Sequence, residues 1–184
     1  MIRLDPYLAG ALALAASIPC ALAQRSAIRV APPIDETQAV TLVGNVYPLA
    51  RPEFDRGTVS DATRLDRMMF ELKPPPSRQA ALDALVAAQH DTASPYFHKW
   101  LTPAEYGARF GVGPQDVARV AAWLQGHGFT VEPLPASRRL VIFSGTAAQI
   151  FDTFHTEIHR YRVGGVTHVA NAQDPQIPEA LAGA

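Results

Sequence analysis

The chain has 184 residues, of which 18% are charged, and a formal net charge of −1. This balance gives no overall field that would draw the protein to nucleic acid or to an anionic membrane. The length suits one domain with an arm, and the single cysteine, Cys20, excludes an internal disulfide framework.

The first 23 residues have the pattern of an export signal. Arg3 gives a weakly positive start, and an apolar run follows from Tyr7 to Ile18. At about a dozen residues this run is too short to span a bilayer, which takes ~20. Small residues end at Ala23, before Gln24, so we predict cleavage between these two residues and a secreted or periplasmic protein. An uncleaved anchor is the alternative.

Residues 24–63 are predicted to form an extended N-terminal arm. Strand-like Val and Leu residues in "AVTLVGNVYPLA" are interrupted by Gly44, and the following "RPEFDRGTVSDAT" is polar and lacks a helical period. Segments of this kind usually lie against a larger body.

Residues 64–171 are predicted to be the folded domain. In "RMMFELK", Met68, Phe70 and Leu72 alternate with Met69, Glu71 and Lys73, which predicts a half-buried strand. Capping residues and apolar periodicity then predict four helices. These begin at the predicted cap residues Ser77 and Ser94, at Thr102 with Glu105 as its capping box, and near Gly113.

Strand signals dominate the second half of this segment. "FTVEPL" and "RRLVIFS" are predicted strands, and "AAQIFDTF" is a helix with Thr146 and Gln149 as its capping box. "EIHRYRVGGVTHVAN" predicts a hairpin, because Gly164-Gly165 suits a tight turn with positive φ. Residues 172–184 are predicted to be a loose tail that starts a linker. The element order predicts an α+β fold, an open antiparallel sandwich with a split β-α-β-β-α-β, ferredoxin-like arrangement.

No catalytic residue and no cofactor site is predicted. The chain has no G-x-S-x-G, Walker or H-E-x-x-H motif, and Ser144 in "FSGTAAQ" is explained by a strand end beside a helix cap. His155 and His159 on one strand would lie roughly 13 Å apart, too far to share a metal ion. His168 lies across the predicted hairpin, which leaves a metal site or a pH sensor as an alternative use of these histidines.

Large aromatic residues are concentrated in "SPYFHKWLTPAEYGARFG". With Lys99 and Arg109 as its cations, this segment lacks the interleaved basic residues of a nucleic-acid stacking surface. The aromatic side chains therefore either fill the domain's own core or contact a protein partner. Tyr96, Phe97 and Trp100 are the best candidates for such an interface.

Several blocks of the sequence resemble the activation domain of the sedolisin peptidases, also called serine-carboxyl peptidases. They are "SPYFHKWLTPAEYGARFG", "DVARVAAWLQGHGFTV" and "FSGTAAQIFDTFHTEIHRYRVGGVTHVANAQDPQIPEALAG", and the resemblance covers about residues 64–184. It implies a propeptide with a subtilisin-propeptide-like fold. In that family a subtilisin-like catalytic domain carries the Glu, Asp and Ser residues, and none of its motifs is present here.

The resemblance implies two roles, as a folding template for the catalytic domain and as its inhibitor, with the tail entering the substrate cleft as an extended peptide. Maturation in acid would act through interface carboxylates such as Glu71, Asp116 or Glu157, with His155, His159 and His168 charging first. A peptidase inhibitor acting in trans, or an unrelated small-ligand or metal-binding module, are the alternatives.

Overall fold

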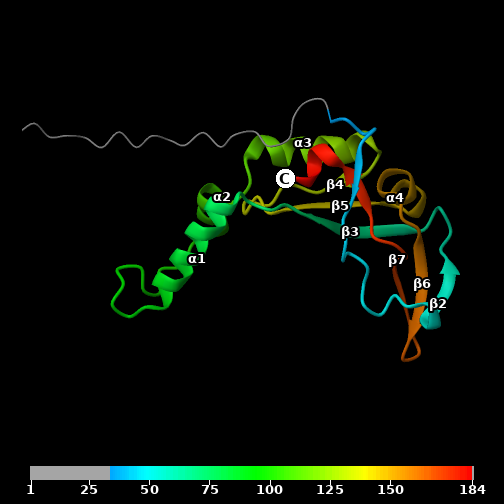
Figure 1. Ribbon diagram of the computed structural model, residues 1–184, viewed down its shortest axis with the longest axis horizontal. Coiled ribbons are helices and arrows are strands. Elements are labelled where there is room, and N and C mark those ends of the chain that lie inside the picture. The colour runs from blue at the N-terminus through cyan, green and yellow to red at the C-terminus, as the bar shows by residue number, and fades with distance from the viewer. Residues whose placement is uncertain (1–33, 184) are drawn as a thin grey trace, which may run out of the picture.

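The computed structural model describes residues 34–183 (Figure 1). The predicted export signal and its cleavage point at Ala23 and Gln24 therefore lie outside the described residues. Within 34–183, helices and antiparallel strands are mixed along the chain, so the predicted α+β class is confirmed.

The central sheet is antiparallel and has the strand order β3-β5-β4. Strand β3 spans Arg64–Glu71, β5 spans Leu140–Thr146 and β4 spans Thr130–Val131. Because side chains alternate along a strand, Met68 and Phe70 of β3 pack against the core, whereas Met69 between them points to the other face.

Helices cover one face of this sheet. Helix α3 (Pro114–Gly126) and helix α4 (Ala147–Phe154) lie on that side with the short α5 (Glu179–Ala182) (Figure 1). The predicted capping box of α4 is present, since the Thr146 side chain accepts from the backbone N–H of Gln149 and the Gln149 side chain accepts from that of Thr146. The core contains aromatic pairs in edge-to-face contact, with Phe129 and Phe143 5.2 Å apart between ring centroids.

A second sheet extends from one end of the central sheet (Figure 1). Its strands are β2 (Asp55–Thr58), β6 (Ile158–Val163) and β7 (Val166–Asn171), in the order β2-β6-β7, and a short 3-10 helix, Pro52–Phe54, precedes β2. The predicted hairpin is confirmed, because Gly164 and Gly165 form its turn with φ values of 58° and 86°. Strand β6 pairs with β2 and β7, and it does not join the β3-β5-β4 sheet as the fourth strand of a ferredoxin-like sheet would.

Helices α1 (Pro76–His90) and α2 (Pro103–Phe110) form a separate extension at the other end of β3 (Figure 1). The predicted capping box of Thr102 and Glu105 is present at α2. Ser77 is not the cap of α1, because the helix begins one residue earlier at Pro76, a residue whose fixed φ suits the first helical turn.

The helix predicted for "YFHKW" does not form. Ser94 instead accepts a hydrogen bond from the Tyr96 backbone N–H at 3.1 Å, and the segment continues as turns. His98 has a φ of 54°, which ends any right-handed helix, and its N–H donates to the Gln89 carbonyl of α1 at 3.1 Å. This contact folds the segment back against α1.

The C-terminal tail is packed, not loose as predicted. Strand β8 (Gln176–Pro178) pairs with β1 (Ala39–Thr41) of the N-terminal arm, and α5 follows directly. Ile177 is 2% exposed and Leu181 is 1% exposed, and both belong to the main hydrophobic core. Burial of these two apolar side chains explains why the segment does not remain free.

Candidate interaction surface

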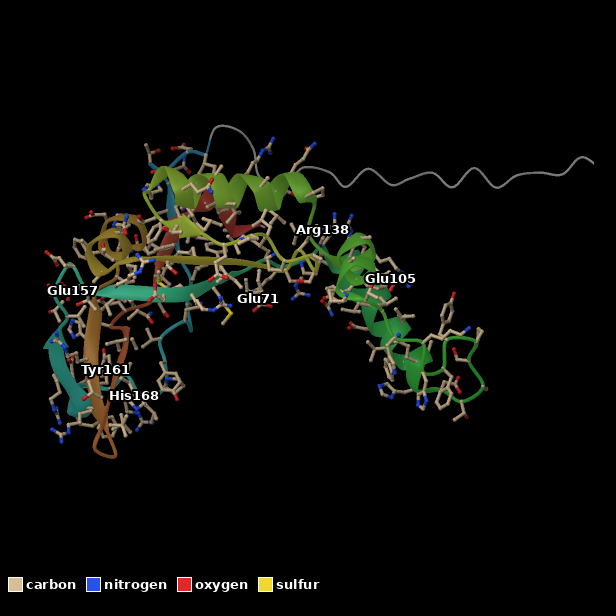
Figure 2. The ribbon with its side chains drawn as sticks, turned by 180° about the vertical axis from the view of Figure 1, so that it is seen from behind. Glu71, Glu105, Arg138, Glu157, Tyr161 and His168 are labelled. Atoms are coloured by element: carbon tan, nitrogen blue, oxygen red, sulfur yellow. The ribbon has the colours of Figure 1, made fainter. Side chains whose placement is uncertain are left out.

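Within residues 34–183, the face of the central sheet opposite α3 carries no helix (Figure 2). Met69 on this face is 68% exposed and lies opposite Ile142 of β5, and Glu71 lies opposite Leu140. An exposed methionine flanked by half-buried aliphatic residues is an apolar surface of the kind that marks interaction sites.

Ion pairs border this apolar surface. Arg67 donates to both carboxylate oxygens of Glu132 at 2.8 Å, and Arg139 donates to Glu71 at 3.1 Å. A second nitrogen of Arg139 donates to the Tyr106 hydroxyl of α2 at 2.9 Å. Exposed pairs of this type add little to stability, but they orient charged groups around the patch.

Ser144 lies in β5 and has a structural role in the same sheet. It is buried in β5, and its hydroxyl accepts a hydrogen bond from the backbone N–H of Arg67 at 3.0 Å, where the β3-β5 register shifts. Arg67 has a φ of 56° at this irregularity. Ser144 therefore supports the sheet, and the helix cap beside it is Thr146.

The two extensions of the fold point to the side of the bare face. In both views, α1 leaves one end of β3 and the β6-β7 hairpin leaves the other end, each away from the side covered by α3 (Figures 1 and 2). Arg138 fixes the first extension to the body by donating to the Gly107 carbonyl of α2, and Arg78 of α1 donates to the Gly111 carbonyl. The molecule is therefore an arch with the bare sheet as its inner roof.

The predicted interface residues lie on the turn beyond α1. Tyr96 is 50% exposed and Trp100 is 63% exposed, whereas Phe97 is half-buried and stacks on His98 with ring centroids 3.8 Å apart. Trp100 also stacks on His98, with ring centroids 5.8 Å apart. The aromatic segment thus divides, because Phe110 is buried while Tyr96 and Trp100 face solvent.

A hollow of about 380 Å³ lies on the second extension, between residues 47–50 and the β6-β7 hairpin. Its walls include Tyr47, Leu49 and Val169, all exposed apolar side chains, and Tyr161 and His168 also line it. Figure 2 shows Tyr161 and His168 on this extension. Both extensions therefore present exposed apolar groups.

His159 of β6 contacts two carboxylates, that of Asp55 on β2 and that of Glu157 just before β6. Its Nδ1 lies 2.8 Å from Asp55 Oδ2, and its Nε2 lies 3.1 Å from Glu157 Oε2. Burial alone would lower the pKa of His159, but the hydrogen bonds to Glu157 and Asp55 outweigh it and raise the pKa. Hydrogen bonds from the Gly57 backbone and from His159 lower the pKa of Asp55. In acid the charged imidazole donates to both carboxylates, so protonation strengthens this contact.

The three predicted pH-sensing histidines lie on three separate elements. His155 does not share a strand with His159, because it ends α4 in the left-handed conformation with a φ of 51°. His168 lies on β7 opposite Tyr161 and is exposed. Asp116, predicted as an interface carboxylate, is 1% exposed and so does not belong to the surface.

The Asp55–His159–Glu157 contact could not be predicted from the sequence, because Asp55 is 104 residues from His159. The bare face had a signal in the alternation of Met69 and Glu71 with core residues. Within 34–183, no group of three or more His, Cys, Asp or Glu side chains is arranged to hold a metal ion. None of the helices in that range has the length and apolar character needed to cross a bilayer.

Comparison with known proteins confirms the predicted resemblance to the activation domain of the sedolisin peptidases. The family described as "Pro-kumamolisin, activation domain" matches residues 55–184, and the chain belongs to this family. Xanthomonalisin from Xanthomonas sp. (strain T-22) is 30% identical over 146 residues, which is 78% of this chain. Sedolisin from Pseudomonas sp. (strain 101) is 27% identical over 103 residues, or 56% of the chain. The matched stretch spans 18% of the length of each relative.

Proposed function

We propose that the chain is the propeptide of an exported serine-carboxyl peptidase, and that the inner side of the arch is the surface that binds the catalytic domain. The observation that carries this proposal is the bare β3-β5 face, set between two extensions in a chain of the activation-domain family. A domain that covers one face of its sheet with helices and leaves the other to solvent has an apolar surface available for a partner.

The residues of the arch suit a protein partner. Met69 on the roof and Trp100 at the end of one extension are each more than half exposed, and burying such a side chain contributes on the order of 2–3 kcal/mol. Aromatic anchors of this kind dominate the energetics of protein interfaces. Bordering charges such as Glu71 and Arg139 supply the polar rim of such an interface.

The surface supports both a template and an inhibitor. A rigid face complementary to the folded catalytic domain stabilises that domain as it folds, because it binds the folded form and not the unfolded one. Residues 172–183 are packed into this domain, so they are not free to enter the substrate cleft as an extended peptide. The same surface also serves an inhibitor that acts in trans.

Release in acid would act through carboxylates at the interface and not through His159. Protonating His159 strengthens its bonds to Asp55 and Glu157, so the β2-β6 pairing persists as the pH falls. Glu71 lies on the bare face beside Arg139, so its carboxylate would face the catalytic domain in the proposed complex. Glu71 is therefore the proposed acid-sensitive contact with the catalytic domain. The predicted export signal would carry the chain outside the cytoplasm.

Binding measurements test the surface directly. The full chain is titrated calorimetrically into mature xanthomonalisin near pH 7, with Met69→Glu and Trp100→Ala as interface variants. Phe151→Glu is the matched control, because Phe151 is 52% exposed on α4, on the helix-covered side. Each interface variant should weaken binding by at least about tenfold, which is 1.4 kcal/mol. Equal effects of Met69→Glu and Phe151→Glu would refute the bare face as the contact.

A further inference from the structure

The tail, residues 174–183, is held by main-chain bonds to the N-terminal arm. Strand β8 pairs with β1 in the register Val40 to Ile177, and the two strands lie side by side in Figure 1. The Leu42 N–H donates to the Pro175 carbonyl and the Glu179 N–H donates to the Gln38 carbonyl, each at 2.8 Å. Among the described residues, β1 is the strand that pairs with β8.

Side chains extend this connection beyond the strands. The Asp174 carboxylate accepts from the backbone N–H groups of Gly44 at 3.1 Å and Asn45 at 2.7 Å. Asn171 donates from Nδ2 to the Asn45 carbonyl at 3.0 Å. The arm and the tail are thus joined on both sides of the short β1-β8 ladder.

The arm is anchored to the body through residues 36–42 and is exposed beyond them. Glu36 accepts a hydrogen bond from Trp123 Nε1 of α3 at 2.9 Å, and Val40 and Leu42 pack against the core. Beyond Leu42 the chain turns outward, with Val43 83% exposed and Tyr47 59% exposed. Exposed loop segments are the preferred sites of proteolytic cleavage.

We propose that residues 36–45 are a latch for the tail, and that cleavage of the exposed segment 43–50 opens it. The intact chain presents the latch to the tail at an effective concentration on the order of millimolar. Once the segment is cut, the three-residue strand, the packing of Val40 and Leu42 and a few hydrogen bonds must hold the latch in a bimolecular complex. The latch then dissociates at micromolar protein, and the backbone groups of β8 lose their partners.

Without the latch, the burial of Ile177 and Leu181 remains to hold the tail, so the tail opens more readily while the rest of the domain stays folded. The chain just before the tail stays fixed to the body, because the Ala172 N–H donates to the Glu157 carbonyl at 2.9 Å and Thr156 Oγ1 donates to the Gln173 carbonyl at 2.8 Å. Central strands and α3 keep their own contacts. Local opening of this kind makes a segment accessible to proteases while the remaining structure persists. The inference depends on contacts within this chain and not on its proposed role toward a peptidase.

An engineered cut tests the latch. A factor Xa recognition sequence is inserted between Tyr47 and Pro48 of the full chain, and hydrogen exchange is followed by mass spectrometry before and after cleavage. Exchange in residues 176–183 should rise about tenfold or more after cleavage, while exchange in α3 and β5 stays unchanged. The same sequence inserted between Thr92 and Ala93, on the α1-α2 extension, is the control for a cut that does not touch the latch.

A point variant tests the same contact without a cut. Asp174→Ala removes the acceptor of two backbone N–H groups and should raise tail exchange several-fold. Asp66→Ala is its control, because Asp66 pairs with the exposed Arg64 on β3. Protection of the tail that survives cleavage at 47–48 would overturn the proposal. So would loss of protection throughout the domain, because the arm would then be needed to keep the whole domain folded and not the tail alone.

Discussion

Truncating Leu181 tests whether the tail belongs to the hydrophobic core of the domain. The Leu181 side chain is 1% exposed and lies in the same buried cluster as Ile177 and Val120. Replacing a fully buried leucine by alanine removes its transfer free energy and leaves a cavity, which together cost about 3 kcal/mol. In a domain of this size that loss lowers Tm by roughly 6–12 °C.

The assay is thermal unfolding of the full chain followed by circular dichroism at neutral pH. Leu134→Ala is the matched control, since Leu134 is 42% exposed and its truncation should move Tm by no more than about 2 °C. A Leu181→Ala variant that unfolds at the same temperature as the parent chain would show that the tail is not packed, and the reasoning from burial would fail.

Three further predictions concern stability and pH. His159→Gln should lower the free energy of unfolding below about pH 6.5 and have little effect near pH 9. The pKa of His159 is raised in the folded state, so its stabilising contribution is complete below the unfolded-state pKa and is lost as the pH rises through the folded-state pKa. Urea titrations at both pH values measure the free energy of unfolding, and an equal loss at both would contradict this prediction. Gly145→Ala should lower the free energy of unfolding by about 1–3 kcal/mol, because the new Cβ would lie 2.4 Å from Phe129 Cδ1. Gly126→Ala is the control and should be neutral or stabilising, since there is open space around Gly126. The denaturant midpoints of the two variants test the difference. Thr102→Ala should cost about 1 kcal/mol by removing the α2 cap, with Thr167→Ala on the exposed β7 strand as control, and equal midpoints for the two variants would refute the capping argument.

Local chemistry made much of the fold predictable. The Thr102 and Thr146 capping boxes and the Gly164-Gly165 turn depend on residues a few positions apart, so the sequence indicated them correctly. The helix at Ser94 failed because a distant contact, from the His98 N–H to the Gln89 carbonyl, set the backbone there. A capping pattern in neighbouring residues does not predict such a contact.

Long-range pairing explains the remaining differences. The tail looked loose because its apolar residues are few, yet Ile177 and Leu181 complete a core that includes the arm. The pairing of β6 with β2, and the closure of Asp55 on His159, join residues about a hundred positions apart. The sequence left open whether Tyr96 and Trp100 fill the core or contact a partner. In the structure both side chains are exposed on the α1-α2 extension.

The inhibition constant of the full chain against mature xanthomonalisin, measured near pH 7 and near pH 4, tests the proposed function most directly. An activation domain held partly by interface carboxylates should inhibit hydrolysis at neutral pH and at least about tenfold more weakly in acid, because protonation removes their charge. Absence of inhibition near pH 7, or equal inhibition constants at the two pH values, would contradict this account.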